Sequence, residues 1–173
     1  MAKALVPFRG QPLVRHAAGL ALAGGCGRAL VVVGAEASAV RAAAPELRFV
    51  DNPGWATGMA SSLRVGLAAL AATTADAALV LLVDMPGVTP EAVRRVAAHA
   101  SPDALVMGGY GPRRGHPVLL GRAHWAGVAA SATGDHGARD YLRTHAAAVT
   151  VVEVGDVADD LDVDTPDALA HHT

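Results

Sequence analysis

Short runs of consecutive apolar residues alternate along the chain with longer stretches of helical periodicity. The runs have the length and β-branched content of strands, and they cover 29–33, 47–50, 78–83, 104–107, 117–120 and 149–154. The stretches between them predict helices over 12–23, 38–44, 61–71, 90–98, 123–130 and 138–145. Thr89 followed by Pro90 is typical of a helix start, because threonine caps free amides and proline fits the first helical position.

The strand candidates ALVVV and ALVLLV are continuously apolar, as expected of strands that are buried on both faces. Such strands in alternation with helices predict a mostly parallel, doubly wound sheet with helices on both sides. We see no linker or internal repeat in the sequence, and 173 residues correspond to about one domain. We therefore expect one α/β domain over residues 1–173, with ligands bound beyond the carboxyl ends of the strands.

Composition narrows the classes of function. The chain has 14 Lys and Arg against 16 Asp and Glu, and this net charge of −2 argues against binding nucleic acid or an anionic membrane through a broad basic face. A single cysteine, Cys26, excludes an internal disulfide and any zinc site built from several cysteines. The uncharged runs are shorter than the roughly 20 apolar residues that cross a bilayer. We expect a cytoplasmic protein.

The most informative segment is 80–87, an apolar strand that ends at Asp84 and continues as Met85-Pro86. Pro86 ends the strand and leaves Asp84 at its carboxyl edge, where a hard divalent cation can use the carboxylate. A carboxylate that hydrogen-bonds the following turn explains the same pattern equally well.

Acidic residues gather again at 159–164, where four carboxylates occupy six positions. On a short strand Asp160, Asp162 and Asp164 would share one face, and a metal ion or solvent would relieve their mutual repulsion. Asp164-Thr165-Pro166 is also typical of a helix start, so a capping Asp within a solvated acidic turn is the alternative.

Residues 52–64 predict a strand exit, a flexible loop and a helix entry. Backbone amides at such a helix start, with the hydroxyls of Ser61 and Ser62, can hold a base, a ribose or a phosphate. An ordinary serine cap on an amphipathic helix is equally compatible with the pattern. Two smaller loops, 115–117 and 134–139, precede a strand and a helix, and the second can bind an anion at the helix start.

Taken in order, these motifs resemble the nucleotidyltransferase family of molybdenum cofactor biosynthesis, particularly its cytidylyltransferase branch. The matching motifs are KALVP, GQPL, NPGWATGMASSLR, DMP, GHP, GDHGAR and DVDTP, and together they cover nearly the whole chain. The resemblance implies a three-layer α/β/α Rossmann-like nucleotidyltransferase fold. It also implies the reaction of a nucleoside triphosphate with a phosphate monoester to give a nucleotidyl diphosphate and pyrophosphate.

The resemblance further implies the site residues. It assigns Mg²⁺ to Asp84 and Asp164, with Asp162 as a neighbouring candidate, and it assigns the triphosphate to Lys3 acting as a point charge. The nucleotide or the acceptor would be surrounded by Asn52, Ser62 and Arg64, and the acceptor side would include His116, Asp135 and Arg139. In-line attack at an α-phosphorus needs neutralisation of charge and positioning more than a protein nucleophile.

One departure from the family pattern concerns the front of the chain. The family has a strand and a Gly-rich loop of the form L-A-A-G-x-G-x-R-x-G before the matching lysine, whereas Met1 and Ala2 precede Lys3 here. That loop supplies backbone amides and an arginine that cradle the triphosphate. We therefore expect this strand and loop to be missing from residues 1–173. Either the start lies at an internal Met of a longer chain, or the chain is a variant with impaired catalysis.

Three functions stay open at this point. The first is a Mg²⁺-dependent nucleotidyltransferase that uses CTP or GTP and a molybdopterin-type acceptor, with a molybdoenzyme or its chaperone as a further partner. The second is a non-catalytic binding protein or chaperone that keeps the acceptor surface. The third is a related transferase that uses a sugar phosphate or phospholactate as acceptor.

Overall fold

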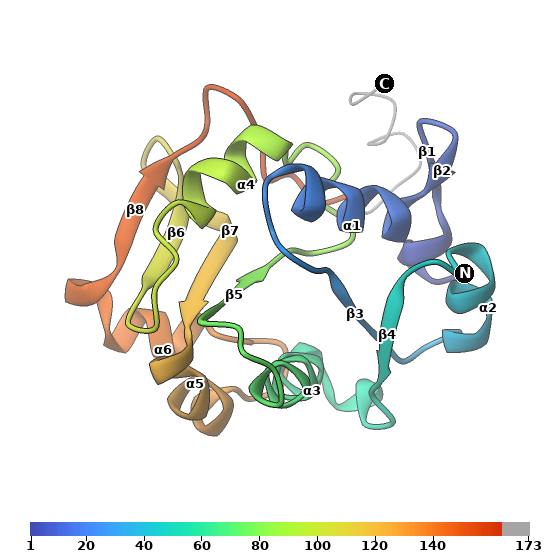
Figure 1. The fold of residues 1–173 in the computed structure, drawn as a ribbon, viewed down its shortest axis with the longest axis horizontal. Helices are drawn as coiled ribbons and strands as arrows, with labels where there is room; N and C mark the ends of the chain where they lie inside the picture. The colour runs from blue at the N-terminus through green and yellow to red at the C-terminus, as the bar shows by residue number, and fades with distance from the viewer. Residues whose placement is uncertain (164–173) are drawn as a thin grey trace.

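The computed structural model describes residues 1–163 and has helices on both sides of a central sheet (Figure 1). One helical layer contains α1 (Leu13–Ala23) and α4 (Pro90–Ala97), and the other contains α3 (Met59–Ala71), α5 (Trp125–Ser131) and α6 (Arg139–Thr144). The predicted three-layer α/β class is therefore confirmed. Asp164, which the sequence assigned to a metal, lies outside the described residues.

The larger sheet has the strand order β5-β7-β6-β8. Its strands are β5 (Ala77–Val80), β6 (Leu105–Tyr110), β7 (Arg113–Gly121) and β8 (Thr150–Glu153). β6 and β8 are parallel, whereas β7 runs antiparallel to both of its neighbours. The larger sheet is thus mixed and not mostly parallel as predicted, because Gly111 and Pro112 form a tight turn that returns β7 beside β6. Gly111 has a φ of 63°, which glycine adopts without steric cost.

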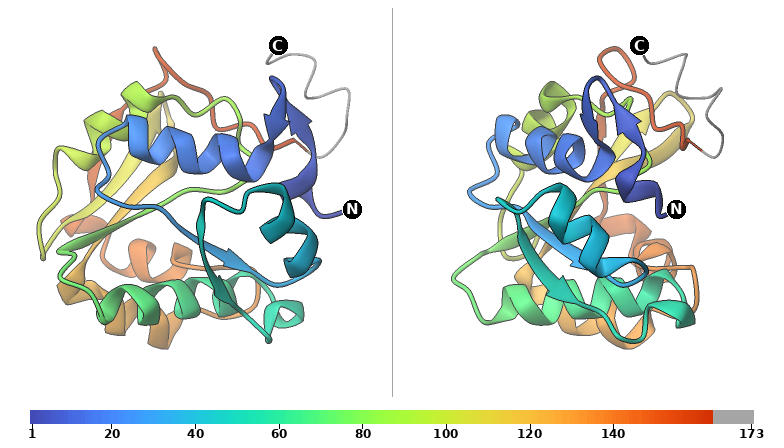
Figure 2. Two further views of the ribbon diagram at one scale, coloured as in Figure 1. Left: turned by 45° about the vertical axis from the view of Figure 1, so that its right-hand side comes forward. Right: turned by 90° about the vertical axis from the view of Figure 1, so that its right-hand side faces the viewer.

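A smaller parallel sheet pairs β3 (Leu30–Val33) with β4 (Arg48–Asp51), and α2 (Ala37–Ala43) connects the two strands. In front of it, η1 (Lys3–Leu5) leads into a hairpin of β1 (Pro7–Phe8) and β2 (Gln11–Pro12). Both views in Figure 2 show this hairpin at the start of α1 and close to the N-terminus. Its turn residues Arg9 and Gly10 have φ values of 47° and 80°, the signs that a type I′ hairpin turn requires.

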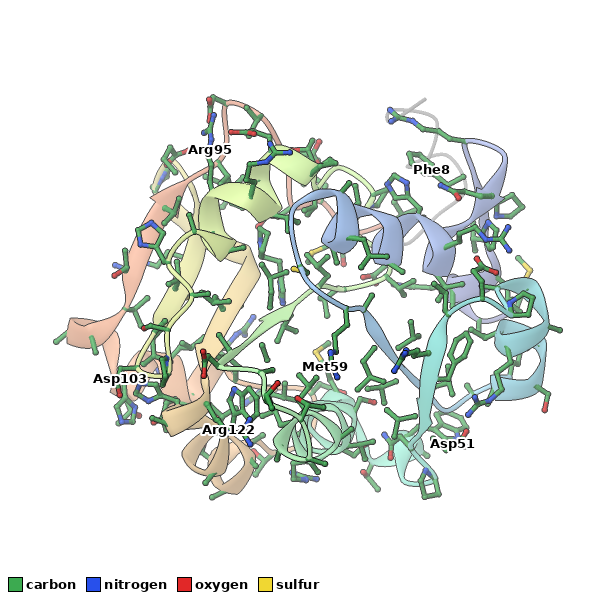
Figure 3. All side chains as sticks on the ribbon, viewed as in Figure 1. Phe8, Asp51, Met59, Arg95, Asp103 and Arg122 are labelled. Atoms are coloured by element: carbon green, nitrogen blue, oxygen red, sulfur yellow. The ribbon has the colours of Figure 1, made fainter. Side chains whose placement is uncertain are left out.

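Alternate residues of the central strands pack on opposite helical layers, and side chains fill the space between the layers (Figure 3). Val106 and Leu119 pack with Val93 of α4, whereas Leu105 and Leu120 pack on the other face. The helical side chains on that second face are Leu67, Trp125, Val128 and Leu142. This two-sided burial is the reason that the strands are continuously apolar in sequence.

Two helix starts position the loops that matter for the site. Thr89 caps α4 as predicted, with its Oγ1 accepting a hydrogen bond from the Ala92 amide at 3.2 Å, and Pro90 is the first helical residue. α3 begins at Met59, two residues earlier than predicted, directly after the short 3-10 helix η2 (Trp55–Thr57). Two further 3-10 turns, η3 (Arg122–His124) and η4 (Ala146–Ala148), flank α5 and α6.

Within residues 1–163, the helices are too short or too polar to cross a membrane.

Candidate functional site

Lys3 and Asp84 form an ion pair beyond the carboxyl end of β5. The Nζ atom of Lys3 lies 2.8 Å from Oδ2 of Asp84, although 81 positions separate the two residues. Their side chains are 45% and 19% exposed, respectively. β5 ends at Val80, so Asp84 lies in the loop before α4 rather than at the last position of the strand. An ion pair that is open to solvent contributes little to folding, typically below about 1 kcal/mol. Opening the pair would therefore cost the fold little.

The acidic segment 159–163 binds the same loop. The Val163 amide donates a hydrogen bond to the Asp84 carbonyl oxygen at 2.8 Å, and the Asp159 amide donates to the Gly87 carbonyl oxygen at 3.2 Å. Asp162 is exposed beside Val163. Two motifs that are far apart in the sequence are thus brought together. The metal role that the resemblance assigned to Asp164 stays a prediction.

The carboxylates of this corner suit an open metal site rather than a closed cage. Among the described residues, no three His, Cys, Asp or Glu side chains converge on one point. Magnesium is commonly held by one or two carboxylates plus substrate phosphates and water. Asp84, with the exposed Asp162 nearby, fits that pattern, because a triphosphate would complete the coordination.

Asn52 holds its own loop together from the inside. Its side chain is buried, and its Nδ2 donates to Oγ of Ser61 at 2.8 Å and to Oγ of Ser62 at 3.0 Å. Its Oδ1 accepts from the Gly54 amide at 3.0 Å, so Asn52 is fully engaged by protein groups. The structure brings Asn52 and Ser62 into contact. The role of either residue toward a nucleotide stays a prediction.

The start of α3 is closed by the loop at 134–137. Oδ1 of Asp135 accepts from the Met59 amide at 3.2 Å, and the Gly134 carbonyl oxygen accepts from the Ala60 amide at 2.8 Å. Gly58 must be glycine here, because its φ is 110° and a Cβ would lie 2.6 Å from the Gly134 backbone. The first amides of α3, which the sequence offered to a phosphate, thus donate to protein acceptors.

The two predicted arginine ligands differ in their surroundings. Arg64 donates from Nη1 to the Ala132 carbonyl oxygen at 2.6 Å and so holds the C-terminal end of α5 against α3. Arg139 is exposed at the first position of α6. Neither arrangement tests their predicted contacts with nucleotide or acceptor.

His116 lies half-buried on β7, and Asp160 of the acidic run is a neighbouring charge. The Asp160 side chain is only 9% exposed, and its Oδ1 lies 3.0 Å from Nη2 of Arg113. Among the described residues, that oxygen has no partner with hydrogen-bond geometry. The carboxylate fits because position 115 is glycine, where a Cβ would come within 2.2 Å of Oδ2.

Burial lowers the pKa of His116, while the charges of Asp160 and Asp84 act in the opposite direction. The imidazole is therefore uncharged at neutral pH. Tyr110 supports this strand by donating its hydroxyl to the His116 carbonyl oxygen at 2.5 Å. Burial also raises the pKa of Tyr110, so that its hydroxyl stays a donor.

The fold and the Lys3–Asp84 corner define an α/β protein of the nucleotidyltransferase class. Residues 1–149 match the model of the MobA-like NTP transferase domain, and the chain belongs to that family, whose members bind nucleoside triphosphates. The chain is also 38% identical over 176 residues to nicotine blue oxidoreductase of Paenarthrobacter nicotinovorans. That match covers 96% of this chain and 85% of the relative.

Solved structures agree with the assignment of the fold. A nucleotidyl transferase from Methanothermobacter thermautotroptrophicus superposes with a TM-score of 0.84 at 20% identity, covering 100% of this chain and 87% of that one. Rv0371c of Mycobacterium tuberculosis H37Rv, solved as a complex with manganese, gives a TM-score of 0.78 at 28% identity and covers 98% and 89%. The predicted Rossmann-like nucleotidyltransferase fold is confirmed by these likenesses.

Proposed function

We propose that this protein transfers a nucleotidyl group, CMP in preference to GMP, from a nucleoside triphosphate to a phosphorylated acceptor of the molybdopterin type. Pyrophosphate is the second product. Family membership supports the nucleotidyltransferase class. The observation that carries the proposal is the partly exposed Lys3–Asp84 pair, at 2.8 Å, with the acidic segment bound to the same loop.

This corner suits a metal–triphosphate complex because the ligand satisfies both members of the pair. Asp84 would hold a divalent cation in place of the lysine ammonium, and Lys3 would hold the phosphate oxygens in place of the carboxylate. Each of the two side chains would thus keep a partner of opposite charge when the pair opens. A neutral ligand would offer neither charge a new partner in exchange.

The reaction forms a bond between an acceptor phosphate oxygen and the α-phosphorus, and it breaks the bond from the α-phosphorus to the bridging oxygen of the pyrophosphate. Asp84 and Asp162 would hold the divalent cation, which we propose to be Mg²⁺ and which supplies charge neutralisation at the phosphates. The manganese complex of the related Rv0371c supports a divalent cation. Lys3 orients the triphosphate, and the half-buried His116 borders the acceptor.

The test is pyrophosphate release from CTP and GTP with Mg²⁺ and a molybdopterin-type acceptor. We expect turnover that is faster with CTP and is lost in Asp84→Asn and Lys3→Gln. Asp51→Asn is a matched control, because Asp51, the last residue of β4 in the smaller sheet, pairs with Arg41 of α2. No turnover with any triphosphate, from protein that binds the acceptor, would favour a non-catalytic binding protein and overturn the proposal.

A second candidate function is reduction of a conjugated heteroaromatic substrate. The observation that favours it is the 38% identity to a protein named nicotine blue oxidoreductase. In that case a reduced nicotinamide dinucleotide would occupy the nucleotide side and donate a hydride, and solvent would supply the proton. Oxidation of the reduced dinucleotide, followed by its near-ultraviolet absorbance, would continue when a chelator removes divalent metals. Nucleotidyl transfer would stop under the same conditions.

A further inference from the structure

The acidic segment 159–163 packs on the rest of the molecule through two glycines. A Cβ at Gly87, in the loop before α4, would lie 2.3 Å from Oδ1 of Asp159. A Cβ at Gly115, on β7, would lie 2.2 Å from Oδ2 of Asp160. A side chain at either position would overlap the carboxylate, so both positions need glycine. Two consecutive carboxylates are thus accommodated by two segments that are distant in sequence.

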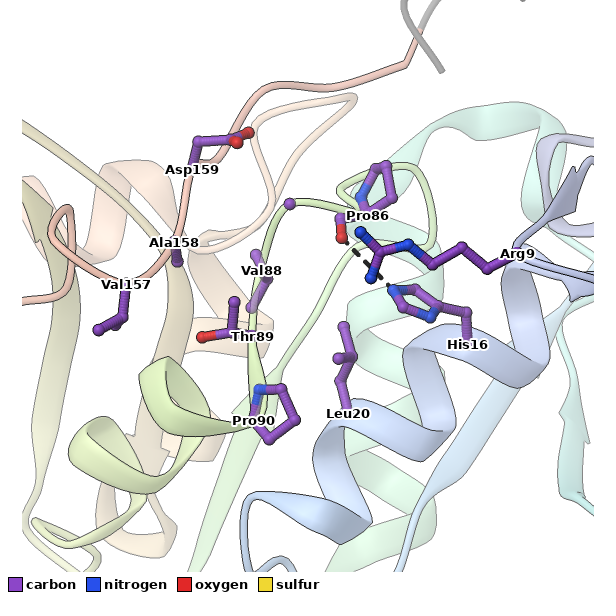
Figure 4. A pocket seen from close by; sticks show the side chains of 11 residues that line it. Arg9, His16, Leu20, Pro86, Val88, Thr89, Pro90, Val157, Ala158 and Asp159 are labelled. Carbon is purple, nitrogen blue, oxygen red and sulfur yellow. Dashed lines mark hydrogen bonds between the residues drawn. The ribbon is translucent and has the colours of Figure 1, made fainter. Parts of the chain in front are cut away.

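Backbone hydrogen bonds hold the same segment along the Asp84 loop. The Asp159 amide donates to the Gly87 carbonyl oxygen at 3.2 Å, and the Val163 amide donates to the Asp84 carbonyl oxygen at 2.8 Å. Figure 4 shows residues 157–159 passing beside this loop, and the two line one cavity of about 450 Å³. The acidic segment and the loop are therefore held in one register.

Asp160 is the buried charge between these two hydrogen bonds. Its side chain is 9% exposed, and its Oδ1 lies 3.0 Å from Nη2 of Arg113. Within residues 1–163, this oxygen has no partner with hydrogen-bond geometry. The Arg113 guanidinium also lies 5.9 Å from the centre of the Tyr110 ring. Replacing a buried ion pair by apolar side chains is often neutral or stabilising, so stability alone does not explain this arrangement.

We propose that Asp160 is a positioning residue for the divalent cation of nucleotidyl transfer. Its carboxylate, held by Arg113 and accommodated over Gly115, fixes the acidic segment against β7. Asp162, two positions further along, is thereby held near Asp84. This inference rests on the proposed function, because that function assigns the cation to these two carboxylates. Residues that orient metal ligands commonly change metal affinity by about 10- to 100-fold when they are substituted.

Asp160 acts through the position of the segment and not as a ligand of the cation. Its Oδ1 lies against the Arg113 guanidinium, and its Oδ2 packs on Gly115. A cation at this carboxylate would be repelled by the guanidinium. Asp162, by contrast, is exposed. One carboxylate thus fixes the segment, and the other faces solvent.

The test is a titration of the protein with Mn²⁺, without nucleotide or acceptor, followed by the electron paramagnetic resonance signal of the free ion. We expect a saturable site that Asp84→Asn removes. Asp160→Asn should weaken Mn²⁺ binding at least about tenfold, because the contact with Arg113 loses its charge. Gly115→Ala should weaken it similarly, because the added Cβ displaces the Asp160 carboxylate.

Arg113→Gln separates positioning from a simple effect of charge. Removing a positive charge near the site would by itself strengthen the binding of a cation. If Asp160 positions the segment, the same substitution weakens Mn²⁺ binding, because the buried carboxylate loses its counter-charge and the segment moves. Gly115→Ala changes no charge, so its effect on Mn²⁺ binding reports displacement alone.

Amide hydrogen exchange reports the contact between the segment and the Asp84 loop directly. We expect the Val163 amide to exchange faster in Gly115→Ala and in Arg113→Gln, because its hydrogen bond to the loop opens more often. The Ala92 amide, at the start of α4, should keep its exchange rate.

Gly127→Ala and Asp51→Asn are matched controls. A Cβ at Gly127, on α5, would lie 2.6 Å from the Tyr141 ring, a comparable overlap in the other helical layer. Asp51 pairs with Arg41 at 2.6 Å in the smaller sheet. Both controls should keep the Mn²⁺ affinity of the unsubstituted protein. Thermal unfolding of each variant shows whether the fold is kept.

Unchanged Mn²⁺ affinity in Asp160→Asn and Gly115→Ala, or tighter binding in Arg113→Gln, would overturn the inference. Faster exchange at Val163 with unchanged affinity would also overturn it, since Asp160 would then serve the fold alone. Failure of the proposed function is distinct from these outcomes. Mn²⁺ binding that depends on Asp160, in protein that releases no pyrophosphate from any triphosphate, supports the positioning role and counts against nucleotidyl transfer alone.

Discussion

The Lys3–Asp84 corner and the start of α3 each contain a polar residue that follows a strand, Asp84 after β5 and Asn52 after β4, yet they use these residues differently. In the first corner two charged side chains meet each other at 2.8 Å and stay partly exposed. In the second, Asn52 is buried, and its side-chain amide forms hydrogen bonds with two serine hydroxyls and one backbone amide. A polar residue after a strand thus becomes a ligand candidate only where solvent, rather than the protein, faces its polar atoms.

The two corners should respond differently to mutation. An exposed ion pair contributes about 0 to 1 kcal/mol to folding, whereas a buried polar group that loses its partner costs about 1 to 3 kcal/mol. Substitutions in the first corner should therefore change activity and leave stability nearly intact. Substitutions in the second should destabilise the fold.

The largest expected effect is on activity in Asp84→Asn. We expect nucleotidyl transfer to fall by at least about a hundredfold, because the neutral amide no longer balances the charge of the cation at the phosphates. The free energy of unfolding should change by less than about 1 kcal/mol. Steady-state pyrophosphate release and urea unfolding measure the two quantities. A loss of stability in proportion to the loss of activity would show that Asp84 supports the fold.

Asn52→Ala should have the opposite effect, a loss of stability. We expect a loss of about 2 to 3 kcal/mol in the free energy of unfolding, because three hydrogen bonds disappear and the Gly54 amide loses its acceptor. Ser62→Ala removes one acceptor and should cost about 1 kcal/mol. Urea unfolding with an unchanged m-value is the measurement. A fully stable Asn52→Ala protein with weakened nucleotide binding would instead make Asn52 a ligand.

Arg64 and Arg139 provide a comparison of the same residue type within one region. Arg64→Gln should reduce the free energy of unfolding by about 1 kcal/mol, because the charged hydrogen bond to the Ala132 carbonyl oxygen is lost. Arg139→Gln, at an exposed position, should change it by less than about 0.5 kcal/mol. Equal effects of the two substitutions on unfolding would contradict the structural role given to Arg64.

The sequence predicted the elements of the fold better than their directions. Its six strands and six helices are present within a few residues of the expected bounds, because continuous apolar runs between helical stretches are a strong signal. The β1–β2 hairpin was missed, since strands of two residues show no periodicity and Arg9 is an unusual residue for a positive φ. The reversal of β7 depends on the turn at Gly111, whereas the alternation of strands and helices predicted a mostly parallel sheet.

The sequence indicated which residues belong to the candidate site, but not which protein groups they contact. Motif order indicated Lys3 and Asp84, which the fold brings into contact. The sequence could not show that Asp135 caps α3, because that bond joins residues 76 positions apart. Asp160 belongs to the acidic run that was predicted as a short strand, but residues 158–163 form no strand, and the burial of Asp160 depends on the absence of a side chain at Gly115 of β7. Such tertiary complementarity has no local signature.

The smallest expected effect is on the pH dependence of the free energy of unfolding, to which the two corners should contribute differently. His116 belongs to the Asp84 side, and burial lowers its pKa in the folded protein. The unfolded chain, with an imidazole pKa near about 6.5, then binds more protons than the folded chain, so stability decreases as the pH falls below that value.

His16 acts in the same sense, since burial also lowers its pKa. One such group contributes at most about 1.4 kcal/mol per pH unit, and less near neutral pH. We expect His116→Gln to flatten the fall in unfolding free energy between pH 7 and about 5, with His99→Gln, at an exposed position, as the matched control. Asn52→Ala should lower the whole curve without changing its slope, because neither the amide nor its serine partners titrate in this range. A change of slope in Asn52→Ala, or an unchanged slope in His116→Gln, would show that the two corners are coupled more closely than their separate hydrogen bonds indicate.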